Sequence, residues 1–101
     1  MAWTKLAPKD TIKIGNGKEF IVNGVIIAVF NVNDKFYATE ALCRHQDGSL
    51  AYGKLEGEII ECPLHFWHYN VTSGELLDYL TGVKLNRYSV EVRGNDLYID
   101  V

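Results

Sequence analysis

Residues 25–39 have the sequence VIIAVFNVNDKFYAT, and this stretch decides the expected fold of the chain. Val25–Val32 is a nearly continuous apolar run rich in β-branched residues, which is typical of a strand buried on both faces. Asn33-Asp34 is a suitable two-residue turn, because Asn and Asp tolerate the left-handed backbone of tight hairpins. Phe36–Thr39 then continues as a second strand. The stretch therefore predicts a β-hairpin with one strand inside the core.

The rest of the chain repeats this pattern of short strands and turns. No window of 11 residues shows the 3.6-residue period of an amphipathic helix. The other expected strands are Glu19–Val22, Ile59–Glu61, Trp67–Val71, Tyr88–Arg93 and Leu97–Val101. The expected turns are Leu55–Glu58, Thr72–Gly74 and Gly94–Asp96. We therefore predict an all-β fold, a small antiparallel sandwich or barrel, forming one domain over residues 1–101.

Composition and charge narrow the possible partners. The 101 residues are 48% hydrophobic and 23% charged, which is ordinary for a soluble globular domain. The net charge of -3 provides no basic surface, so we expect no nucleic-acid partner. The longest apolar run, Val25–Phe30, is far shorter than the roughly 20 residues of a membrane-spanning helix. Met1–Asp10 is polar and mixed in charge, unlike a signal peptide, so we expect a cytoplasmic protein without a membrane partner.

The only two cysteines each lie within three residues of a histidine, in Cys43-Arg44-His45 and Cys62-Pro63-Leu64-His65. Both pairs fall in expected loops, where side chains can converge on one point. Thiolate and imidazole ligands suit zinc, copper and iron–sulfur centres. A structural zinc site is one alternative, although zinc-finger spacing pairs Cys with Cys and His with His. The second alternative is that both cysteines are simply buried and the nearby histidines are unrelated to them. This alternative requires two independent coincidences of spacing.

The mixed pattern C-x-H followed by C-x-x-H resembles the Rieske family of iron–sulfur proteins. The resemblance implies one 2Fe-2S cluster per chain, with Cys43 and Cys62 on one iron. It implies that His45 and His65 hold the other iron. These four residues are the expected cofactor-binding and metal-ligating set.

The resemblance extends along most of the chain. The matching flanks are Phe36–Thr39, Leu55–Gly57, Ile60–Pro63 and Gly74 of the Thr-Ser-Gly turn. It implies a three-layered antiparallel β fold, with a small cluster-binding subdomain over roughly Leu42–Leu77.

Details of the motif separate two kinds of family member. High-potential members carry an additional cysteine in each ligand loop and a membrane anchor; here the two positions hold Gly48 and Leu64. The chain therefore is similar to the soluble ferredoxins of ring-hydroxylating oxygenases. It departs from many of them at Phe66, where they have Gly, and in Tyr79–Val83, where they have prolines.

The resemblance implies an electron carrier that is not itself an enzyme and has no catalytic residue. It would pass single electrons from a ferredoxin reductase to a terminal oxygenase or similar acceptor. Three other functions stay open: a small subunit of a nitrite reductase complex, a redox-sensing module, and a zinc-stabilised interaction domain. Colour separates the last of these, because zinc absorbs no visible light.

Residues near the second pair are weaker candidates. In high-potential members a tyrosine four residues after the second histidine donates its hydroxyl to a ligand sulfur, which implies a cluster-tuning role for Tyr69. The alternative is that Tyr69 only fills the core. His68 is a less suitable iron ligand than His65, and a strand position facing solvent or a partner is favoured for it. Leu64, Phe66 and Trp67 could form an apolar docking rim, with core packing as the alternative for Phe66 and Trp67. Acidic residues near the site could attract a basic partner, with an ordinary solvated surface as the favoured alternative: Asp47, Glu56, Glu58 and Glu61.

Overall fold

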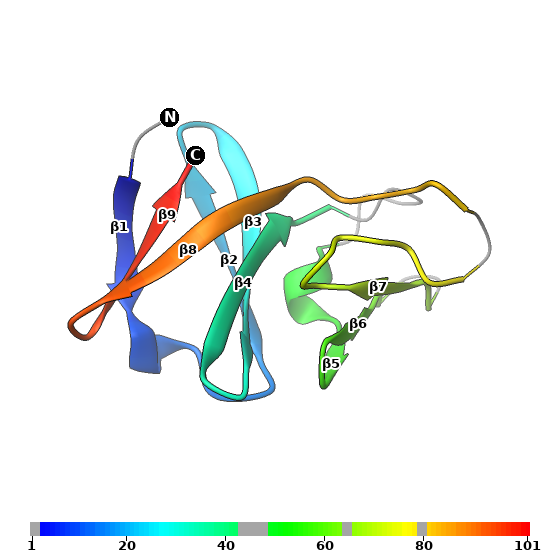
Figure 1. Ribbon diagram of the computed structural model, residues 1–101, viewed down its shortest axis with the longest axis horizontal. Helices are drawn as coiled ribbons and strands as arrows, with labels where there is room; N and C mark the ends of the chain where they lie inside the picture. Colours follow the sequence, from blue (N-terminus) through cyan, green and yellow to red (C-terminus); the bar gives the residue numbers. More distant parts are fainter. Residues whose placement is uncertain (1–2, 43–48, 64–65, 79–80) are drawn as a thin grey trace.

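The computed structural model describes residues 3–42, 49–63, 66–78 and 81–101, and within these it contains nine strands, two 3-10 helices and no α-helix (Figure 1). The elements are β1 (Trp3–Pro8), η1 (Lys9–Thr11), β2 (Gly17–Val22), β3 (Val25–Val32), β4 (Lys35–Glu40), η2 (Leu50–Tyr52), β5 (Lys54–Glu56), β6 (Ile59–Glu61), β7 (His68–Asn70), β8 (Arg87–Arg93) and β9 (Asp96–Asp100). They form a six-stranded antiparallel sheet in the order β1-β9-β8-β4-β3-β2 and a three-stranded sheet in the order β5-β6-β7. The all-β prediction is confirmed.

Strand β3 separates two hydrophobic cores. Its residues 27–32 are all buried, as the continuous apolar run predicts. Side chains alternate across a strand, so Ile27 and Val29 enter one core, together with Leu97 and Ile99 of β9. The other face of β3 contributes to a second core, which lies between β3 and the three-stranded sheet. That core comprises Ala28, Phe30, Val32, Ala41, Leu50, Ala51, Ile60, Cys62, Tyr69, Val71, Leu76 and Leu85.

The predicted hairpin after β3 is also confirmed. Asn33 and Asp34 have φ values of 51° and 68°, the left-handed conformation that a two-residue hairpin turn requires. The side chain of Asn31 holds the turn, because its Oδ1 accepts a hydrogen bond of 2.8 Å from the Asp34 N–H. Its Nδ2 donates to the Ile12 carbonyl at 2.8 Å. β4 leaves this turn and pairs with β3 along its whole length.

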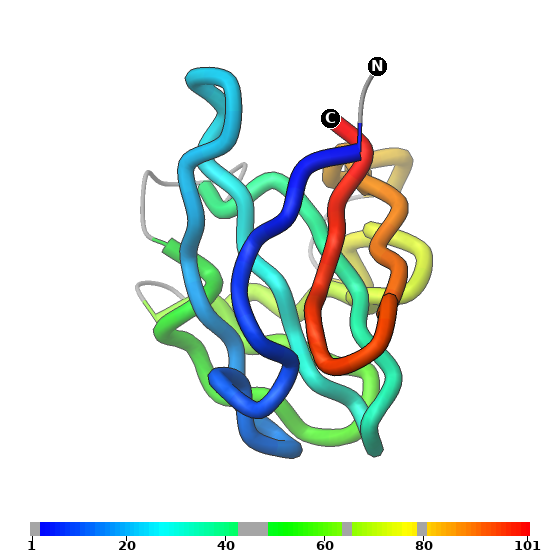
Figure 2. The backbone as a smooth tube through the Cα atoms, turned by 90° about the vertical axis from the view of Figure 1, so that its left-hand side faces the viewer, coloured from blue at the N-terminus to red at the C-terminus, as the bar shows by residue number. Residues whose placement is uncertain are grey.

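Two strands were missing from the sequence prediction. β1 lies in the polar N-terminal segment and pairs with β9, so the two ends of the chain lie side by side (Figure 2). The guanidinium of Arg93 lies 5.2 Å from the ring of Trp3 and 4.6 Å from that of Tyr98, which adds cation–π contacts across this edge. The turn predicted over Leu55–Glu58 was too long: β5 includes the first two of these residues, and only 57–58 form the turn.

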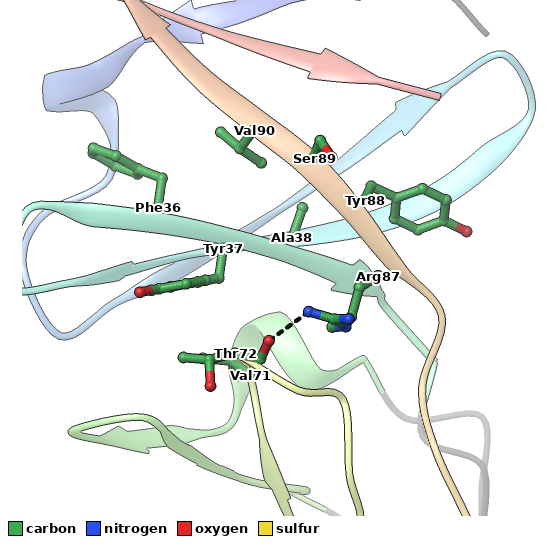
Figure 3. Close-up of a pocket in the computed structure, with 9 residues that line it drawn as sticks. All are labelled: Phe36, Tyr37, Ala38, Val71, Thr72, Arg87, Tyr88, Ser89 and Val90. Carbon is green, nitrogen blue, oxygen red and sulfur yellow. Dashed lines mark hydrogen bonds between the residues drawn. The ribbon is translucent and has the colours of Figure 1, made fainter.

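The two sheets are joined where the segment after β7 meets β8. The Arg87 Nη1 donates a 2.7 Å hydrogen bond to the Thr72 carbonyl, beside a hollow that Tyr37 also lines (Figure 3). Gly74 has a φ of 81°, and a Cβ there would lie 2.5 Å from the Leu85 carbonyl oxygen. Only glycine suits this close approach in that conformation. In the described part of the chain, no helix is long and apolar enough to cross a membrane.

Candidate metal centre

The first ligand loop is closed at its base by backbone pairing. Leu42 and Ser49 form an isolated antiparallel bridge, and the Leu50 N–H donates to the Ala41 carbonyl at 2.7 Å. Residues 43–48 between them include the predicted ligands Cys43 and His45, and these lie outside the described residues. The acidic candidate Asp47 lies there too.

The second ligand loop begins at Cys62, directly after β6. The Cys62 N–H donates to the Trp67 carbonyl at 2.7 Å, and the Phe66 N–H donates to the Cys62 carbonyl at 3.1 Å. The side chain of Cys62 is fully buried, at 0% exposure. His65 and Leu64 lie outside the described residues, so Cys62 is the one predicted ligand for which the structure gives surroundings.

The bases of the two loops lie next to each other. Ala41, Leu50 and Cys62 belong to the same hydrophobic core. Gly53 lies against β6 so closely that a Cβ at this position would overlap the Glu61 carbonyl oxygen. The chain that leaves the first loop therefore packs on the strand that leads into the second. The bases of both loops thus lie together and the Cys62 thiol is shielded from water, which fits an iron–sulfur centre held by the thiol and imidazole donors of the sequence motif.

Phe66 has an unusual backbone for a large residue. Its φ is 58°, a left-handed conformation that costs a residue with a Cβ about 1–2 kcal/mol. This conformation gives a physical reason for the glycine that many soluble ferredoxins have here. The Phe66 side chain is 59% exposed, whereas Trp67 is partly buried against the second core. Of the two aromatic residues, Phe66 is therefore the more exposed to solvent.

Tyr69 lies in β7 opposite Ile60 and is fully buried. It belongs to the same core as Cys62, so the core-filling role is present in the structure. A hydrogen bond from its hydroxyl to a ligand sulfur remains a prediction.

His68 contacts two carboxylates at once. Its Nδ1 lies 2.6 Å from Asp78 Oδ2, and its Nε2 lies 3.1 Å from Glu61 Oε1. The hydrogen bond with Asp78 is the main reason that the pKa of His68 is raised above its ordinary 6.5, and the bond with Glu61 adds to it. Among the described residues, no three His, Cys, Asp or Glu side chains are placed to hold a metal ion. Carboxylates engage both ring nitrogens of His68, so in this arrangement neither nitrogen is available to bind iron.

Sequence reasoning missed this arrangement. It treated Glu61 as part of a general acidic surface and did not single out Asp78. Antiparallel pairing of the two neighbouring strands, β6 and β7, places Glu61 opposite His68, so this contact follows once the strand register is known. Asp78 follows the turn after β7, and no local pattern indicates that its side chain returns to His68.

Comparison with known proteins gives consistent similarities. The family model described as Rieske [2Fe-2S] domain matches residues 2–89. Ferredoxin CarAc of Metapseudomonas resinovorans is 40% identical over 98 residues, which make up 96% of this chain and 92% of that protein. The ferredoxin component of biphenyl 2,3-dioxygenase from Rhodococcus jostii (strain RHA1) is 32% identical over 101 residues, 100% of this chain and 94% of that protein. A chain in the solved complex of reduced oxygenase and oxidized ferredoxin in carbazole 1,9a-dioxygenase has a TM-score of 0.87 and 35% identity, with coverage of 96% of this chain and 91% of that chain.

Proposed function

The chain belongs to the family of Rieske [2Fe-2S] domains, and on that basis we propose that it is the ferredoxin component of a ring-hydroxylating dioxygenase system. It is an electron-transfer protein with a Rieske [2Fe-2S] cluster, and it is not itself the catalyst. A [2Fe-2S] cluster takes the place of the zinc ion that the alternative of a zinc-stabilised interaction domain would require. The relatives of at least 30% identity named above are ferredoxins, two of them named for dioxygenases, which favours this role over a nitrite reductase subunit or a redox sensor.

The ligands that we propose are Cys43 and Cys62 for one iron, and His45 and His65 for the other. When bound, the cluster supplies reversible one-electron chemistry at a potential raised by its histidine ligands. Backbone hydrogen bonds close the base of each loop, which supports a fixed arrangement of these proposed donors. Burial of Cys62 keeps water from its sulfur. Residues from roughly Leu42 to Leu77, which include the three-stranded sheet, would form the cluster-binding subdomain.

The partners that we propose are a ferredoxin reductase as donor and a terminal oxygenase as acceptor. One structural relative was solved in complex with an oxygenase. Phe66 in the second ligand loop and Leu77, which is bonded to the His68 carbonyl, leave 59% and 48% of their surface exposed, which suits an apolar contact with a partner. A cytoplasmic location is part of the proposal, because ligand thiols stay reduced there.

A coupled assay tests this role. We expect electrons to pass from a dioxygenase-system reductase through this protein to the oxygenase component of a carbazole or biphenyl dioxygenase. Product should form only when all three proteins are present, and omission of the chain is the control. The proposal would be contradicted if the reductase reduces this protein but no such oxygenase turns over, while the protein supports activity in a nitrite reductase complex.

Tyr69→Phe should keep the cluster and lower its reduction potential. A hydroxyl that donates to a ligand sulfur stabilises the more negative reduced state more than the oxidised state. A net difference of about 0.5–1.5 kcal/mol corresponds to about 20–65 mV for one electron, at 59 mV per tenfold change. Redox titration followed by visible absorbance measures the shift. An unchanged potential with full cluster content would assign Tyr69 to core packing alone.

A further inference from the structure

The outer face of the three-stranded sheet carries a row of charged side chains. Lys54, Glu61 and His68 lie opposite one another on β5, β6 and β7, and Asp78 continues the row beyond β7. The inner face of the same strands packs Leu55, Ile60 and Tyr69 on the second core. The row is therefore separate from the core, and it crosses the sheet in the last register before the second ligand loop.

His68 is the centre of this row. Besides the two ring contacts, its backbone N–H donates to Asp78 Oδ1 at 3.1 Å. The Leu77 N–H donates to the His68 carbonyl at 2.8 Å. Carboxylates accept hydrogen bonds but do not donate them, so both ring nitrogens donate only when the ring is an imidazolium. A charged His68 satisfies both carboxylates at once.

The position of the network links it to the ligand loop. The Glu61–His68 pair directly precedes the Cys62–Trp67 backbone pair that closes the loop. Asp78 ties the segment after β7 to the same point. Three segments of the chain thus meet at His68, one of them leading straight into Cys62.

We propose that His68 is a positioning residue, whose imidazolium clamps Glu61 of β6 and Asp78 of the following segment, holds the base of the second ligand loop together and so slows loss of the cluster. The inference rests on the proposed ligand role of Cys62. It is tested without any redox partner, so its failure would leave the electron-transfer role untouched.

The test is the rate at which the oxidised holoprotein loses its visible absorbance in excess chelator between pH 5.5 and 9. Below pH 6.5, His68→Gln should raise this rate about threefold to tenfold, a modest effect because the charges are partly exposed. The folded pKa of His68 is raised, so the clamp is complete below 6.5 and is lost as the pH rises through the folded value. The ratio of the two rates should therefore fall toward one in alkaline solution. Among the described residues, Lys54, Glu56 and Glu61 line the same hollow as His68, and Asp78 contacts its ring from the following segment. All four charged groups are present in both proteins.

Two further variants separate the clamp from ordinary packing. His68→Lys should restore slow cluster loss and keep it at pH 9, because an ammonium stays charged there. Asp78→Asn should speed the loss as His68→Gln does. The matched control is Lys5→Gln, which breaks an exposed ion pair of 3.4 Å with Asp96 in the large sheet and should not change the rate. Equal rates for wild type and His68→Gln at every pH would overturn the proposal, as would a pH-independent excess that His68→Lys does not reduce.

Discussion

Cys62→Ser is expected to give a colourless protein that contains almost no iron or sulfide. The wild-type protein should contain two irons and two sulfides per chain, be red-brown, and show a rhombic electron-spin signal with a low average g value once reduced. Serine is close to cysteine in size, so the fully buried site can accept it. It removes the soft thiolate that an iron–sulfur centre requires.

The measurement is iron and sulfide analysis of anaerobically purified protein, combined with visible spectra. Loss of the cluster should also lower the thermal midpoint, because binding free energy at such a site contributes to folding. Tyr69→Phe is the matched control from the same core, and it should keep its colour. A Cys62→Ser protein with two irons and two sulfides would remove Cys62 from the ligand set, and stoichiometric zinc in the wild type would contradict the cofactor.

The fold was predictable where local pattern and burial agree. The run Val25–Val32 is apolar on both faces because β3 lies between two cores, and its turn residues Asn33 and Asp34 adopt the conformation that their side chains favour. β1 was not predictable in this way. Its residues are half exposed at the edge of the sheet, so its position depends on pairing with β9, a partner about 90 residues away.

The proposed ligands fall in two short sequence motifs, whereas their surroundings depend on residues that are distant in the sequence. The C-x-H and C-x-x-H spacings alone led to the family that the comparison shows. The clamp at His68 requires Asp78 to return across a turn, and the contact between Gly53 and Glu61 depends on how two loops pack. Such contacts follow from the tertiary path of the backbone, which no spacing rule describes.

The close contact between Gly53 and Glu61 predicts a large loss of stability when Gly53 is replaced. Gly53→Ala should lower the apparent thermal midpoint of the holoprotein by about 10–20 °C. Gly53 has φ and ψ of -77° and 178°, which any residue adopts, so alanine brings no conformational strain. The obstacle is steric, because the new Cβ would overlap the Glu61 carbonyl oxygen and Glu61 directly precedes Cys62. Backbone cannot rotate away as a side chain does, so we expect a cost of about 3 kcal/mol, the upper part of the range for overpacking.

Gly57→Ala is the matched control for this effect. Gly57 has the opposite properties, a φ of 59° and no atom within 4 Å of an added Cβ, so its replacement should cost only about 1 kcal/mol. Thermal scans at one heating rate should therefore rank Gly53→Ala well below Gly57→Ala, and iron analysis should show reduced cluster content in the first alone. Equal midpoints and full clusters in both variants would mean that the first loop shifts away from β6 at little cost. In that case the close contact at Gly53 would not be what holds the two ligand loops together.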